Sequence, residues 1–68
     1  MDPYALARRI RAFRKLKGFT QSDLADSLGV SLGVLGAIER GTRKPDVQIL
    51  KQVSEVLGID YEELIDTT

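Results

Sequence analysis

The segment Thr20–Gly41, TQSDLADSLGVSLGVLGAIERG, predicts two short helices joined by the three residues Gly29-Val30-Ser31. A connection this short makes the two helices cross steeply. The crossing needs a small residue where the backbones approach, and Ala25 provides it. It also needs a positive φ angle in the turn, which glycine adopts at no steric cost, as at Gly29. The segment therefore predicts a helix-turn-helix unit over about residues 20–41.

The ends of these two helices are marked by capping residues. We expect the first helix to start at Thr20 and to run to Leu28, with Asp23 in the place of a capping-box acid, although aspartate reaches back less well than glutamate. Ser31 then caps a helix over about Leu32 to Arg40, which ends at Gly41. The inner faces are expected to be apolar and to consist of Leu24, Ala25, Leu28, Val30, Leu35 and Ile38.

A longer helix is expected before this unit, over about Tyr4 to Lys17. Asp2-Pro3 is a favourable start, a capping residue followed by a proline whose missing N–H does no harm, and Gly18 is suited to end the helix. Apolar residues recur three and four positions apart, which predicts one buried face. That face comprises Leu6, Ile10, Phe13 and Leu16, with Ala5 or Ala7 beside them.

Two further helices are expected after the unit. Asp46 caps a helix that runs to Leu57 and ends at Gly58, and Asp60 caps a short helix over Tyr61 to Ile65. The longer one has an apolar stripe made of Val47, Leu50, Val53, Val56 and Leu57. Because no alternating strand pattern occurs, the fold class is all-α, a compact arrangement of five helices.

Composition excludes several functions. A chain of 68 residues allows one domain, residues 1–68, and buries only about 60% of its surface on folding. Cysteine and histidine are both absent, which removes disulfides, thiolate chemistry and the commonest zinc ligands. We expect no enzyme, no catalytic residue, no metal, no cofactor and no small-molecule substrate. No apolar run is long enough to span a membrane and no secretory signal is visible, so an intracellular protein is expected.

Charge is distributed unevenly along the chain. Residues 1–44 hold nine Lys/Arg and four Asp/Glu, a net charge of +5, whereas residues 45–68 hold one Lys and six Asp/Glu, a net charge of −5. A basic front with an acidic back is compatible with DNA binding even though the total is zero, because binding depends on the local field. Segregation of charge by helix, without any nucleic acid, is the alternative explanation.

The chain from Ile10 to Leu64 resembles the lambda-repressor/Cro-like family of helix-turn-helix regulators, also called the xenobiotic-response-element type. The matching residues are Arg14, Gly18-Phe19-Thr20-Gln21, Leu24-Ala25, Gly29-Val30-Ser31, Ile38-Glu39-Arg40-Gly41, Arg43-Lys44-Pro45 and Leu57-Gly58-Ile59. The resemblance implies a lambda-repressor-like five-helix domain whose third helix enters the major groove of double-stranded DNA. It further implies a transcriptional regulator, most often a repressor that binds a near-palindromic operator as a homodimer, in the cytoplasm of a prokaryote or as a phage protein at the nucleoid.

The resemblance also implies which residues contact phosphate. The family positions carry over to Thr20, Gln21, Arg43 and Lys44, and a helix N-terminus with a glutamine donor suits phosphate chemically. The alternative for Thr20 is a plain helix cap, and the alternative for Arg43 and Lys44 is a solvated loop.

The base-facing positions are where this sequence departs from the family. They match Leu32, Gly33, Val34 and Ala37, with Gly36 nearby, and none of these carries the polar side chain that usually reads base edges. Three interpretations remain open: contact with thymine methyl groups, recognition of DNA shape, or an apolar face for a protein partner. Ser31 and Arg40 flank this face and are further DNA-contact candidates.

The resemblance also assigns a structural ion pair. Arg14 and Glu39 match a pair that forms an ion bridge between the first helix and the end of the third, rather than two unrelated surface charges. Ile59 and Tyr61 are candidates for the core or for a dimer interface, one residue in each role. The other basic residues of the first helix are expected to be mostly solvated; these are Arg8, Arg9, Arg11, Lys15 and Lys17.

One rival function uses the same fold. The apolar recognition face could bind a protein, as in an antitoxin-like or partner-regulating module. Steep salt dependence of binding to duplex DNA separates the two functions, because only phosphate contacts produce it.

Overall fold

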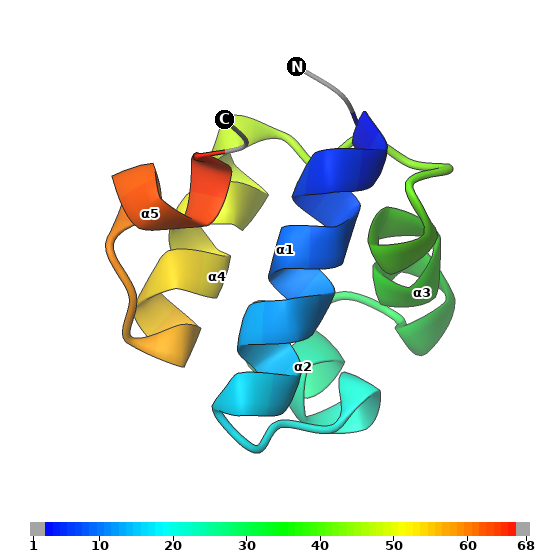
Figure 1. The fold of residues 1–68 in the computed structure, drawn as a ribbon. Coiled ribbons are helices and arrows are strands. Elements are labelled where there is room, and N and C mark those ends of the chain that lie inside the picture. Colours follow the sequence, from blue (N-terminus) through cyan, green and yellow to red (C-terminus); the bar gives the residue numbers. More distant parts are fainter. Residues whose placement is uncertain (1–2, 67–68) are drawn as a thin grey trace.

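Residues 3–66, which the computed structural model describes, form five helices (Figure 1). They are α1 (Pro3–Leu16), α2 (Gln21–Leu28), α3 (Leu32–Arg40), α4 (Val47–Leu57) and α5 (Tyr61–Ile65). The predicted all-α fold is confirmed, and the bounds of α3 and α5 agree to the residue. The first helix begins and ends one residue earlier than predicted. The expected cap at Asp2 lies outside the described residues.

The long helix α1 runs through the middle of the molecule, with α3 on one side and α4 and α5 on the other (Figure 1). It packs against all three, while α2 packs against α3 and α4. The helix-turn-helix pair is thus held from behind by both long helices, and this leaves the opposite side of α3 uncovered.

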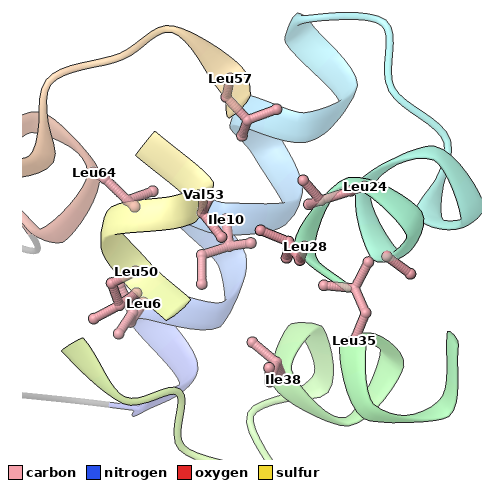
Figure 2. Close-up of a cluster of buried hydrophobic side chains, with 11 residues drawn as sticks. Leu6, Ile10, Leu24, Leu28, Leu35, Ile38, Leu50, Val53, Leu57 and Leu64 are labelled. Atoms are coloured by element: carbon pink, nitrogen blue, oxygen red, sulfur yellow. The ribbon is translucent and has the colours of Figure 1, made fainter. Parts of the chain in front are cut away.

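The core draws side chains from every helix, and Figure 2 shows them converging between the ribbons. The most deeply buried ones are Ile10, Leu24, Leu35, Ile38, Leu64 and Val53. Ala25 is buried at the position predicted for the close approach of α2 and α3, and Val30 packs partly against the same cluster. Burial of these side chains is the main force that holds such short helices in place.

Caps and glycine turns fix the helix ends largely as predicted. The Thr20 hydroxyl accepts a bond from the Asp23 N–H, and the Asp23 carboxylate accepts one from the Thr20 N–H, both at 3.0 Å. Gly29 has a φ of 71°, the left-handed conformation that the short turn requires. Asp60 lies at the predicted N-cap position of α5, but its side chain makes no capping hydrogen bond.

Two residues predicted in the apolar stripes are exposed instead. Leu16 is 75% exposed because the buried face of α1 follows Leu6, Ile10 and Arg14, and Leu16 lies on the far side of that row. Val47 is 56% exposed and lines an open hollow at the start of α4.

Arg9 was predicted to be solvated, and this was wrong. Its Nε donates to the carbonyl of Leu64 at 3.0 Å, and its Nη2 donates to the carbonyl of Glu63. The guanidinium also lies 5.3 Å from the centre of the Phe13 ring. Arg9 therefore binds the last carbonyls of α5, a helix too short to be stable alone, and attaches it to α1.

Candidate nucleic-acid interface

A buried ion pair joins α1 to the end of α3. Arg14 Nε donates to Glu39 Oε2 at 2.7 Å, and Arg14 Nη2 donates to Glu39 Oε1 at 3.1 Å. The two residues are only 7% and 6% exposed. The remaining nitrogen, Nη1, donates to the carbonyl of Phe19 at 2.8 Å, so the same guanidinium also fixes the turn that leads into α2.

Gln21, the first residue of α2, completes this cluster. Its Nε2 donates to Glu39 Oε1 at 3.2 Å, and the residue is half-buried. The family resemblance predicts a phosphate contact for Gln21, and this bond to Glu39 is not among the sequence-based predictions. The two residues lie 18 positions apart on different helices, so no spacing rule signals their contact; only the angle at which α2 crosses α3 brings them together.

The N-terminus of α2 is held by its capping box. Hydrogen bonds from the Thr20 backbone N–H and then from its hydroxyl hold the pKa of the Asp23 carboxyl below its usual range. The box satisfies one N–H of the first turn. The N–H groups of Gln21 and Ser22 have no acceptor within the helix, which is the general condition of a helix start.

The outer face of α3 is sparsely polar. Leu32 is 50% exposed and Gly33 is exposed, whereas Val34 packs partly against the core and Ala37 is half-buried. Ser31 caps the helix by accepting a bond from the Val34 N–H at 3.1 Å.

Gly36 is buried beneath the side chain of Arg40. A Cβ atom at position 36 would lie 3.0 Å from Arg40 Nη1, so the guanidinium rests directly against the glycine. Arg40, predicted at the flank of the face, therefore folds back over the middle of α3.

The loop from Gly41 to Asp46 begins with three bonds to one carbonyl. The Thr42 N–H, the Thr42 hydroxyl and the Arg43 N–H all donate to the carbonyl of Ala37, at 3.0, 3.2 and 3.3 Å. The side chains of Arg43 and Lys44 are exposed, and Pro45 beyond them is buried. The backbone at this basic pair is thus fixed to the end of α3.

The two candidates for a dimer interface, Ile59 and Tyr61, are both half-buried and pack partly against the core. Tyr61 also lines an open hollow of about 370 Å³. Its floor and walls are mostly apolar, with two cations among them; the other lining residues are Leu6, Arg43, Lys44, Pro45, Val47 and Leu50.

Together these features define a helix-turn-helix protein, in which α2 and α3 form the motif and α1, α4 and α5 support it. The helix-turn-helix family HTH_3 matches residues 10–64, and the chain belongs to this family. It is a transcriptional regulator of the helix-turn-helix type, and the relatives that match are regulators rather than enzymes. In the described residues, no helix combines the length and apolar character needed to cross a bilayer.

Two relatives illustrate the range of lengths. The chain is 50% identical over 64 residues to YazB, an uncharacterized HTH-type transcriptional regulator of Bacillus subtilis, covering 94% of this chain and 93% of YazB. It is 39% identical over 62 residues to the HTH-type transcriptional regulator SinR of the same species, covering 90% of this chain and 56% of SinR. The match thus spans nearly all of YazB but about half of SinR.

Two solved structures have the same fold. The restriction-modification controller protein C.AhdI of Aeromonas hydrophila superposes with a TM-score of 0.88 at 30% identity, over 94% of this chain and 97% of that one. SinR, described as the master regulator for biofilm formation and solved in complex with DNA, superposes with a TM-score of 0.82 at 39% identity, over 90% and 98% of the two chains.

Proposed function

We propose that this chain binds double-stranded DNA sequence-specifically and represses transcription as a homodimer on a near-palindromic operator. The observation that carries the proposal is the likeness to the SinR domain solved in complex with DNA. The matched relatives include several regulators of Bacillus, and we extend the proposal to the bacterial cytoplasm as the place of action.

Two elements supply the phosphate contacts in this proposal. One is the start of α2, where the open N–H groups of the first turn and the Gln21 amide act as donors. The other is the loop after α3, where Arg43 and Lys44 are exposed on a backbone fixed to Ala37. With donors at the start of α2 and in the loop after α3, the phosphate contacts would set the register and depth of α3 in the major groove.

The salt dependence of binding tests the phosphate contacts. Arg43→Ala and Lys44→Ala should each weaken binding to a random-sequence duplex and lower the slope of log K against log salt by about one unit. Lys51→Ala removes an exposed cation from α4 and is the matched control. If both loop variants keep the slope of the control, the loop is not part of the interface.

Base reading would rest on the apolar part of α3. Leu32, half exposed, is suited to touch thymine methyl groups, and Arg40 brings a fork of donors over Gly36. On an operator selected from a random pool, uracil in place of thymine should lower affinity at particular positions, and Leu32→Ser should remove most of that difference. Equal affinity for an all-uracil operator would eliminate methyl contacts and leave DNA shape as the source of specificity.

The dimer surface would lie on the C-terminal half, around Tyr61 and Val47, and would leave Arg43 and Lys44, which line the same hollow, free for DNA. Val47 is 56% exposed there, an unusual position for an apolar residue on a buried stripe. Sedimentation should give a dimer that Val47→Asp converts to a monomer, with melting little changed because the residue is already exposed. A monomer for the parent chain at high concentration, both alone and on DNA, would refute this part of the proposal.

A protein-binding role is the second candidate, favoured by the exposure of Leu32 on a face with few polar groups. Weak DNA binding with a flat salt response, together with loss of a protein complex in Leu32→Ser, would support it over DNA binding.

A further inference from the structure

The carboxylate of Glu39 receives three donors, and one of them comes from a residue assigned to the DNA surface. Arg14 provides two of the donors and the Gln21 amide provides the third. Glu39 itself is buried, so it cannot reach DNA directly. The cluster therefore connects a buried charge to the first residue of α2.

This bond fixes the orientation of the Gln21 amide. Its NH₂ group has two hydrogens, and one of them points at Glu39 Oε1. A flipped amide would set its carbonyl oxygen against a carboxylate oxygen, which is repulsive. The second hydrogen of the same NH₂ group is left for an acceptor outside the cluster, and the half-buried position of Gln21 restricts how the side chain moves.

Arg14 makes this arrangement compatible with a phosphate nearby. An uncompensated carboxylate behind Gln21 would repel the DNA backbone, but the bidentate guanidinium neutralises it. The third nitrogen of Arg14, Nη1, donates to the Phe19 carbonyl directly before the Thr20 cap. One cation therefore compensates the Glu39 charge and fixes the position where α2 starts.

We propose that Glu39 is a positioning residue for DNA binding, which holds the Gln21 amide so that its second N–H faces a phosphate of the operator. This inference rests on the proposed function, because it requires Gln21 to contact phosphate. It assigns to the buried pair a role in binding as well as in holding the helices together.

The test uses a duplex selected from a random pool, with single phosphates replaced in turn by neutral methylphosphonate. Gln21→Ala should lower affinity for the unmodified duplex by about tenfold or more, the worth of a hydrogen bond to a charged group. On the duplex that lacks the charge of the phosphate contacted by Gln21, Gln21→Ala and the parent chain should bind with nearly equal affinity. That duplex identifies the contacted phosphate.

Glu39→Gln then separates positioning from a merely structural role. If Glu39 acts through Gln21, Glu39→Gln lowers affinity for the unmodified duplex but not for the duplex with methylphosphonate at the identified position. The double variant then binds no worse than Gln21→Ala. An equal loss on both duplexes, or additive losses in the double variant, overturns the inference. If Gln21→Ala binds every duplex like the parent chain, the phosphate contact itself fails, and that result counts against the proposed function.

A second measurement needs no variant and covers the case in which Glu39→Gln does not fold. Relaxation of the side-chain ¹⁵N amides should show Gln21 Nε2 nearly as rigid as the backbone, in contrast to the exposed Gln48 on α4. A Gln21 amide as mobile as that of Gln48 in the free protein contradicts positioning by Glu39.

Discussion

At the start of α2 the side chains of Thr20, Gln21 and Asp23 are all hydrogen-bonded, whereas the outer face of α3 offers few polar side chains. Thr20 and Asp23 satisfy each other, and Gln21 bonds to Glu39. On α3 the exposed positions are held by Leu32, Gly33 and, at its end, Arg40. The two surfaces belong to one helix-turn-helix unit, in which residues 29–31 alone separate α2 from α3.

The contrast indicates a division of labour. Polar groups that are pre-ordered by a network bind a uniform partner such as phosphate without paying to order themselves. An apolar face cannot select bases by hydrogen bonds. Its position in the groove depends on the phosphate contacts made by the elements beside it. We therefore expect changes in the network to act mainly on stability and affinity, and changes on the outer face to act mainly on sequence preference.

The largest effect is expected from breaking the network at its centre. Arg14→Ala leaves the buried Glu39 carboxylate without its cation, which typically costs about 3–5 kcal/mol. Circular dichroism during urea unfolding measures the loss. Arg11→Ala removes an exposed cation from the same helix and should cost less than about 0.5 kcal/mol. Equal stability of the two variants would mean that the network does not hold the fold.

The next effect is expected where α2 and α3 approach behind these surfaces. Ala25 is buried, and Ala25→Leu should cost about 1–3 kcal/mol through overpacking. Ala12→Leu adds the same atoms at an exposed position of α1 and serves as the control. Should the two variants melt together, the crossing would have room that the structure does not show.

The sequence could predict what depends on local rules. Helix periodicity and capping residues located α3 and α5 to the residue, and the turn at Gly29 followed from the need for a positive φ. The pairing of Arg14 with Glu39 across two helices came from the family resemblance, not from a local rule.

Contacts that depend on packing between distant helices were out of reach. The bonds from Arg9 to α5 span 54 and 55 positions, and their only sequence signal is an arginine in a basic helix. The exposure of Leu16 follows from a charged residue, Arg14, taking a core position, which a hydrophobic pattern reads as polar. The bond of the Gln21 amide could not be predicted either, because its partner Glu39 lies 18 positions away on another helix.

A smaller effect is expected from the glycines of α3 and of the turn before it, in opposite directions. At Gly33 an added Cβ would meet only the Ser31 hydroxyl at 4.0 Å, so Gly33→Ala should stabilise the chain by about 0.4–1 kcal/mol. At Gly29 the positive φ makes Gly29→Ala destabilising by about 1–2 kcal/mol. Thermal melting of both variants checks the signs. If Gly33→Ala also weakens operator binding while the fold is firmer, the glycine serves close approach to DNA.

The smallest effect concerns the charge at the start of α2 and appears only on acidification. Because hydrogen bonds from Thr20 lower the pKa of Asp23, its ionised form stabilises the fold above the usual carboxyl range, and this contribution is lost as the pH falls through the lowered value. Asp23→Asn keeps an acceptor for the Thr20 N–H but carries no charge, so its melting temperature should fall less than that of the parent chain between about pH 7 and pH 3. Asp26→Asn removes the same charge from the same helix without touching Thr20 and is the matched control. An acid response of Asp23→Asn equal to that of the parent would show that the capping box holds α2 through hydrogen bonds alone, and that the polar order at this end does not depend on charge.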